Sequence, residues 1–348
     1  MTNPSLTGSK EILMRVLLVS LLLVSSSVFA EPPTALKTIG IFEEYDEKDG
    51  EVVLGASVNV SGAVCMETGL CLAVADEGRF AQVFALENDR ITIGQRLYLA
   101  ETKDKPKREL RDFDLEGLTA MGNILITVGS HSRGRKSCKS PDRSLRIFWG
   151  EVTGDLIGTR QPLTDQSQSL EPLFEQFETL EQSFDQPLQK NGLNIEGIAA
   201  QGSTIFVGFR APFTGENSAS VQVAEFTLDA LENGDFSGAQ LHHVAVDGPP
   251  GRGIRGMEAV GDEMILLIGD SGVGAGNKAI CDQPSPHRVG EFSIHRWTPG
   301  QLTAEAVMTL DLPDEDWKAE GILPMGDEGV LIFFDGPPNG APHFYEFP

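Results

Sequence analysis

Short apolar segments recur along the chain, and each follows a glycine turn and ends at another glycine or an aspartate. One copy covers residues 195–202, continues into the apolar residues 205–207 and ends at Gly208. Further copies begin at residues 115, 254 and 319, and a weaker copy begins at residue 60. Apolar runs of this length between turn residues predict β-strands. The pattern therefore predicts an all-β domain built from repeated strand–turn–strand units.

The spacing of the repeat indicates the fold. Its central glycine is found at Gly62, Gly117, Gly197, Gly256 and Gly321, at intervals of 55, 80, 59 and 65 residues. A period this long that consists of strands is typical of a β-propeller, in which each repeat forms one four-stranded blade. We therefore predict a single β-propeller over residues 31–348, with five blades favoured and six as the alternative.

Two segments depart from the simple repeat. The last copy ends with residues 343–347, one strand short of a full blade, and we expect residues 37–42 to supply the missing strand and close the ring. The longest interval contains residues 170–184, in which Glu, Gln, Leu and Phe occur at helical spacing. We predict one helix there, within an insertion near residues 165–190.

The first thirty residues have the pattern of a secretory signal peptide. Lys10 and Arg15 precede the apolar run of residues 16–23, and small residues lead to a cleavage site after Ala30. A membrane anchor, which needs about 20 predominantly apolar residues, is the alternative. We expect a periplasmic or secreted protein with no membrane anchor after cleavage.

Export bears on the four cysteines, because an oxidising compartment favours disulfides. Cys65 and Cys71 flank a predicted hairpin and can face each other across two strands. This would leave Cys138 and Cys281, which lie in long polar loops at corresponding places in their repeats. Three pairings are formally open. We predict Cys65–Cys71 and Cys138–Cys281, with one reduced and buried pair as the alternative.

The charge of the chain excludes some partners. The 51 acidic and 27 basic residues give a net charge of -24, which repels nucleic acid and offers no cationic face to anionic lipid. We expect neither nucleic acid nor a membrane surface as partner, and we favour a monomer.

The repeat also predicts a site. In a propeller the inner strand of each blade lines a central channel, so equivalent positions of the repeats converge at one mouth. This places Glu116, Glu196, Arg255 and Glu320 around the mouth. The loops beside them contribute His131, Arg133, Arg210, Asp270 and Asp335 as further candidate ligand-binding residues.

These residues have two interpretations. The glutamates can be structural, accepting backbone hydrogen bonds or pairing with Arg255 and Arg210. Alternatively, Glu116, Glu196 and Glu320 can hold a metal, since converging carboxylates suit a hard cation such as calcium.

Three segments carry a resemblance to known proteins. Residues 194–199, 208–212 and 129–132 resemble blocks of the bacterial domain-of-unknown-function family 3616. More distantly, the Glu-Gly-hydrophobic strand starts are similar to those of the phytase-like, esterase-like exported propellers, from which Arg255 departs. The first resemblance implies no known activity. The second implies calcium-dependent phosphoester hydrolysis.

Two classes of function follow, and the sequence leaves open whether the protein is an enzyme. We expect a binding propeller that holds a small ligand or a protein partner over the channel mouth. The alternative is a calcium-dependent phosphoesterase or esterase-like hydrolase. In it, Arg79, Arg133 and Arg210 would position an anionic group and His131 would assist proton transfer.

Overall fold

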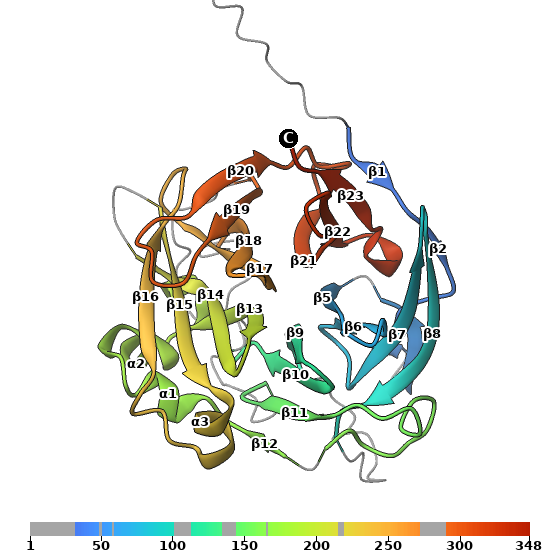
Figure 1. Cartoon of the computed structure of the whole chain (residues 1–348), viewed down its shortest axis with the longest axis horizontal. Helices are drawn as coiled ribbons and strands as arrows, with labels where there is room; N and C mark the ends of the chain where they lie inside the picture. Colours follow the sequence, from blue (N-terminus) through green and yellow to red (C-terminus); the bar gives the residue numbers. More distant parts are fainter. Residues whose placement is uncertain are drawn as a thin grey trace, which may run out of the picture.

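A computed structural model describes residues 32–48, 51–57, 59–100, 113–133, 144–164, 166–214, 219–271 and 290–348. Its five main sheets surround a central axis, as Figure 1 shows, and strands β5, β9, β13, β17 and β21 lie nearest that axis. The chain is therefore an all-β propeller with five blades, as the repeat predicts.

Each blade is an antiparallel sheet whose strands follow the chain from the axis outward. The first blade contains β5 (Val60–Cys65), β6 (Cys71–Ala75), β7 (Phe80–Glu87) and β8 (Arg90–Tyr98). The second contains β9 (Leu115–Met121), β10 (Ile124–Gly129), β11 (Ile147–Glu151) and β12 (Ser167–Gln168). The third contains β13 (Asn194–Gln201), β14 (Thr204–Thr214), β15 (Ser220–Thr227) and β16 (Gln240–Ala245). The fourth contains β17 (Arg252–Val260), β18 (Glu263–Asp270), β19 (Ser293–Trp297) and β20 (Glu305–Thr309). The fifth contains β21 (Lys318–Pro324), β22 (Gly329–Asp335) and β23 (His343–Glu346).

The N-terminal part of the propeller closes the ring, although by a different segment from the one predicted. Strand β1 (Thr34–Ala35) pairs antiparallel with β23 and completes the fifth blade. Strand β2 (Lys37–Ile39) instead pairs parallel with β8 at the outer edge of the first blade. The segment thus joins the first and last blades. A hairpin of β3 (Glu43–Lys48) and β4 (Glu51–Ala56) follows.

The insertion in the longest repeat is helical but divided. It forms α1 (Glu171–Phe174), α2 (Glu178–Phe184) and the 3-10 turn η1 (Leu188–Lys190) in place of the single predicted helix. Phe177 between the two helices is extended, with φ -133° and ψ 114°. This break lets Phe177 pack against the same apolar cluster as the helices. Two further short helical segments are α3 (Leu228–Asn233) and η2 (Pro338–Gly340).

The core lies between neighbouring blades, which explains the continuous apolar runs of the sequence. Residues 329–334 of β22 are buried without alternation, as are residues 264–269 of β18. A strand covered by other blades on both faces needs apolar side chains at every position, as in a sheet buried on both faces.

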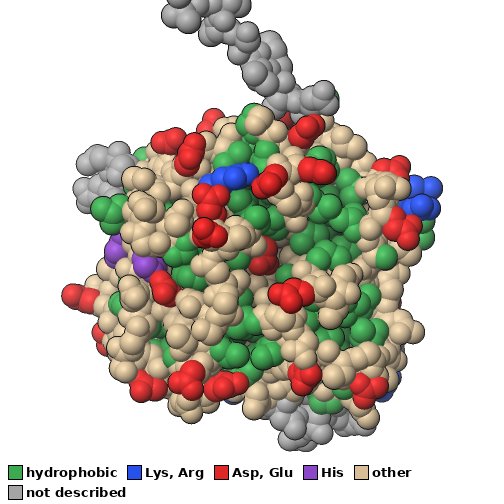
Figure 2. Space-filling model, viewed as in Figure 1, with side chains coloured by type: hydrophobic (Ala, Val, Ile, Leu, Met, Phe, Trp, Pro, Cys, Tyr) green, Lys and Arg blue, Asp and Glu red, His purple; other side chains and the backbone are tan. Residues whose placement is uncertain are grey.

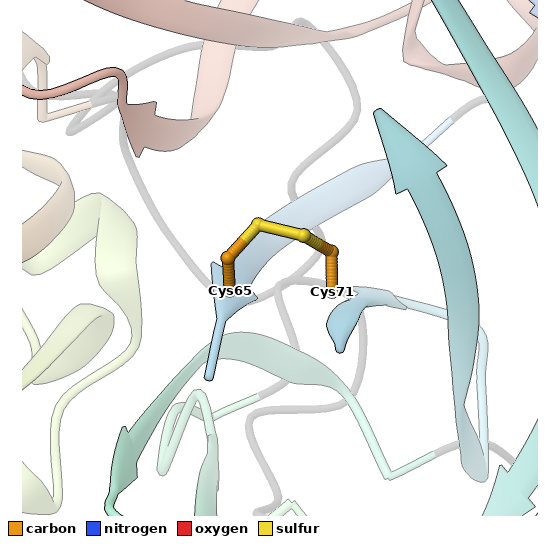
Figure 3. Close-up of a disulfide and its surroundings, with 2 residues drawn as sticks. All are labelled: Cys65 and Cys71. Atoms are coloured by element: carbon orange, nitrogen blue, oxygen red, sulfur yellow. A yellow bond between two sulfur atoms is a disulfide. The ribbon is translucent and has the colours of Figure 1, made fainter. Parts of the chain in front are cut away.

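The disulfide between Cys65 and Cys71 is confirmed. It joins the facing ends of β5 and β6, where the Cα atoms are 4.0 Å apart (Figure 3). Cys138 and Cys281 lie outside the described residues, so their pairing stays a prediction. The predicted signal peptide also lies outside these residues. Within the described part of the chain, no helix is long and apolar enough to cross a membrane.

Candidate functional site at the channel mouth

A β-bulge precedes the repeat glycine in each inner strand. In β13, Ile195 pairs with Phe209 and Gly197 pairs with Gly208, so Glu196 between them has no partner across the ladder. The equivalent bulged residues in the other blades are Ser61, Glu116, Arg255 and Glu320. A bulge redirects the side chain of its extra residue. The fold therefore gives the four predicted residues equivalent places, and Ser61 occupies the fifth.

The repeat glycines form the constriction next to these bulges. A Cβ atom on Gly62 would lie 2.9 Å from Gly117 Cα, and one on Gly256 would lie 2.7 Å from the Glu320 carbonyl oxygen. The inner strands thus approach one another too closely for any side chain at these positions. This close approach holds the bulged side chains in one layer around the axis.

Arg255 joins two of the predicted glutamates. Its guanidinium is 2% exposed, and Nη1 lies 2.7 Å from Glu196 Oε2 while Nη2 contacts Glu320. Arg210, itself bulged in β14, contacts the other oxygen of Glu196 and donates from Nε to the Ser271 carbonyl at 2.7 Å. These are the contacts expected of a structural network, in which each buried carboxylate has a cationic neighbour.

On the side of the mouth formed by the first and second blades, the carboxylates have no arginine beside them within the described residues. Single oxygens of Asp76, Asp114 and Glu116 all lie within 4.8 Å of one another. Asp114 accepts a hydrogen bond from Ser130, and within the described ranges none of the three carboxylates forms an ion pair. This acidic cluster of Asp76, Asp114 and Glu116 contains Glu116 of the predicted metal set and two carboxylates from outside that set.

Burial and mutual repulsion perturb the acidic cluster. Burial first, and then the charges of Glu196, Asp76, Asp114 and Glu320, raise the pKa of Glu116 well above its usual value. The pKa of Asp76 is raised in the same way, by burial and then by Asp114. Carboxylates that disfavour ionisation together become easier to ionise when a cation is placed among them.

A protein-family model matches residues 59–147 and 157–341, which span nearly all of the propeller, and its description is "Protein of unknown function (DUF3616)". The chain belongs to the DUF3616 family. No curated protein matches the DUF3616 chain.

Two solved structures are similar to the DUF3616 propeller at low identity. The extracellular domain of BT4673 from B. thetaiotaomicron has 11% identity and a TM-score of 0.34, and the match covers 85% of this chain and 27% of that one. A chain of the Mitotic Checkpoint Complex has 9% identity and a TM-score of 0.34, with 97% and 81% covered. The DUF3616 chain thus spans about a quarter of the length of the first structure.

His131 of the DUF3616 propeller lies in the core, which corrects its predicted role at the mouth. It is fully buried, its Nδ1 lies 2.9 Å from the Gly129 carbonyl oxygen, and its Nε2 accepts from the Leu170 amide at 3.2 Å. Burial lowers the pKa of His131 to about 4. Both ring nitrogens are engaged, so His131 holds the helical insertion against the second blade.

The other predicted loop residues have separate contacts. Arg133 binds the helical insertion, where it contacts Asp185 and the Phe184 carbonyl oxygen. Asp335 pairs with Lys318 across the β21–β22 ladder and lies close enough to Glu320 to raise its pKa. The backbone of Asp270 lies opposite that of Arg252 in the β17–β18 ladder of the fourth blade. Arg210 contacts the bulged Glu196 directly.

Among the charged side chains on the face drawn in Figure 2, Asp and Glu predominate. Asp and Glu side chains lie around its rim and in its central depression, and few Lys or Arg side chains are visible there. The face agrees with the net charge of the chain.

Proposed function

We propose that the protein is an exported binding propeller whose acidic cluster at the channel mouth holds a hard cation such as calcium. The signal-peptide pattern of residues 1–30 supports export, and the disulfide between Cys65 and Cys71 suits an oxidising compartment. The cation would then present open coordination positions to a small ligand or a partner protein over the mouth.

The observation that carries this proposal is the unequal distribution of arginines. Arg255 and Arg210 bind Glu196 and Glu320, and they leave Glu116 with no ion pair among the described residues. The donors of the acidic cluster are carboxylate oxygens, which calcium prefers, with waters or carbonyl oxygens completing its six to eight ligands. The predicted set of Glu116, Glu196 and Glu320 is less suitable, because the Arg255 guanidinium lies between the last two.

The constriction limits where a ligand can lie. The cavity at the constriction is lined by repeat glycines and by the bulged Ser61, Glu116 and Glu196, and it has room for about one water molecule. Its walls are the glycines that already approach one another closely. A ligand would therefore bind above the bulged side chains and would not pass through the channel.

The hydrolase alternative loses one of its assigned groups. His131 has no free nitrogen, and its pKa of about 4 makes it a weak base near neutrality. No described observation favours hydrolysis over binding. Activity on a panel of phosphate and carboxyl esters, with and without calcium, tests this alternative directly.

Thermal unfolding with added calcium or with a chelator tests the cation site. A cation that binds only the folded state raises the melting temperature with its concentration. We expect calcium to do so in the wild type but not in Glu116→Gln or Asp76→Asn. The exposed Glu67→Gln is the matched control and should respond like the wild type.

The same experiment has a second readout. Without calcium, Glu116→Gln should be more stable than the wild type near pH 8, because the substitution removes a carboxylate whose raised pKa disfavours its charged form. An unchanged melting temperature in calcium and in chelator would refute the cation site.

A further inference from the structure

Arg252 is a buried arginine without a carboxylate partner. It lies in β17, three residues before Arg255, and is 3% exposed. Its Nη2 donates to the carbonyl oxygens of Ile268 and Glu291 and to Ser293 Oγ, at 3.3, 3.3 and 2.6 Å. Within the described residues Arg252 forms no ion pair, and its Nε has no hydrogen-bond partner. Buried charges are ordinarily paired, whereas this guanidinium has no carboxylate in direct contact.

A cavity of about 220 Å³, open to solvent, adjoins this guanidinium. Its wall includes Arg252 from β17, Ser293 and His295 from β19, residues 306–309 of β20, and the loop at Asp247 and Gly248. A Cβ atom on Gly248 would lie 2.7 Å from Arg252 Nη1, so the glycine leaves room beside this nitrogen. A bulge at residue 307 interrupts the β19–β20 ladder opposite His295. The cavity shares no wall residue with the channel mouth.

The floor of this cavity offers neutral hydrogen-bonding groups as well. Ser293 Oγ accepts from Arg252, and it lies 3.0 Å from His295 Nε2. Its hydroxyl proton is therefore available to Nε2, which places the proton of neutral His295 on Nδ1. That Nδ1 is buried and has no partner, and burial lowers the pKa of His295 to about 4. The Nε of Arg252 and the Nδ1 of His295 are thus two buried donors that an acceptor in the cavity can satisfy.

The rim has the opposite charge. Asp247 and Glu291 are exposed and line the same cavity. Burial lowers the pKa of Arg252, and the charges of Glu291 and Asp247 offset part of this effect. A cationic floor beneath an acidic rim disfavours a ligand that carries only negative charge. It complements a small molecule with an anionic group at one end and an ammonium group at the other.

We infer that the cavity in the fourth blade is a second ligand site, specific for a small zwitterion of the α-amino-acid class. The ligand carboxylate lies at Arg252 on the floor, and its ammonium group lies toward Asp247 and Glu291 at the rim. Arg252 Nε has no hydrogen-bond partner and Nη1 lies beside the space left by Gly248, so these two nitrogens can donate to the ligand carboxylate. This site is independent of the cation proposed at the channel mouth.

Titration calorimetry of the mature chain at pH 7 tests the inference with four probes: L-alanine, acetate, methylamine and inorganic phosphate. We expect L-alanine to bind more tightly than acetate, and methylamine and phosphate to bind most weakly. Arg252→Gln should weaken L-alanine by about thirtyfold or more, since it removes one partner of a buried charge pair. Arg296→Gln in the same blade is the matched control, because Arg296 contacts Glu263 and Phe347 away from the cavity.

A second variant does not depend on the folding of a core substitution. Asp247→Asn with Glu291→Gln changes two exposed residues. It should weaken L-alanine, whose ammonium group loses its partners, and strengthen acetate, which the rim charges repel. If the wild type binds acetate or phosphate as tightly as L-alanine, or more tightly, the amino-acid assignment is overturned. Absence of binding by all four probes, or L-alanine binding that persists in Arg252→Gln, would overturn the site. The response to calcium should be unaffected in all these variants, which separates this result from the channel-mouth proposal.

Discussion

Thr119 and Glu258 meet across the channel although their blades are not neighbours. Thr119 Oγ1 in β9 donates to Glu258 Oε1 in β17 at 3.1 Å, and the third blade lies between their own blades in the ring. Glu258 Oε1 also accepts from the Ala259 amide at 3.0 Å, whereas Oε2 is buried without a partner. This pair forms a second polar layer, two residues beyond the repeat glycines Gly117 and Gly256.

The Glu258 carboxyl should make stability depend on pH. Burial raises its pKa from 4.5 to about 8. Between these values the unfolded chain loses the proton and the folded chain keeps it, so the free energy of unfolding falls as pH rises, by at most about 1.4 kcal/mol per pH unit. Glu258→Gln should remove this decline and be more stable than the wild type by roughly 1–2 kcal/mol near pH 8. Urea unfolding at pH 5 and pH 8 measures it, with the exposed Glu305→Gln as control; an equal pH slope in both variants would contradict the prediction.

Removal of Arg255 should destabilise the propeller. Arg255→Met leaves Glu196 and Glu320 buried without this cation, which should cost about 3–5 kcal/mol at pH 8. Burial already raises the pKa of Glu320 to about 7, so the cost should shrink at pH 5, where this carboxyl is protonated. Chemical unfolding at the two pH values checks this expectation. A loss that does not vary with pH would indicate a packing effect alone.

The repeat glycines should not accept a methyl group. Gly62→Ala would place Cβ at 2.9 Å from Gly117 Cα and 3.1 Å from the Leu118 amide nitrogen, and these backbone atoms cannot move aside without shifting a strand. We expect a loss of about 1–3 kcal/mol in the free energy of unfolding. Gly238→Ala is the control, because a Cβ there meets nothing within 4 Å, and it should be neutral or slightly stabilising. Similar stabilities for the two variants would show that the inner strands are less tightly packed.

His131 should contribute stability that is lost in acid. Its folded pKa is lowered from 6.5 to about 4, so the contribution is present above pH 6.5 and is lost as pH falls toward 4. His131→Asn should lower the free energy of unfolding by about 2–4 kcal/mol at pH 7, because it breaks the ring contacts to Gly129 and Leu170. Asparagine tolerates the φ of 52° at this position, so the loss reports on the ring. Circular dichroism melts measure this. The melting temperatures of the wild type and His131→Asn should differ clearly at pH 7 and lie closer together at pH 4.5.

The repeat in the sequence was sufficient for the architecture. Glycine is found at Gly62, Gly117, Gly197, Gly256 and Gly321 because the inner strands of five blades approach one another there, and the apolar runs follow from burial between blades. The hairpin spacing likewise predicted the disulfide between Cys65 and Cys71. These features could be read from the sequence because every blade repeats the same pattern and because the disulfide joins residues six positions apart.

Long-range contacts decided the rest. Residues 37–42 were expected to form the closing strand. Within this segment, β2 pairs with the outer edge of β8 in the first blade, and Thr34–Ala35 of β1 closes the ring by pairing with β23. His131 resembled a mouth residue, yet its place beneath the insertion depends on Leu170, 39 residues away. Which glutamates are neutralised depends on Arg255, which reaches Glu196 and Glu320 in the two neighbouring blades, and on Arg210, which pairs with Glu196 within its own blade. Sequence periodicity orders positions along each blade, whereas ion pairing and burial depend on distances between blades that only the closed ring sets.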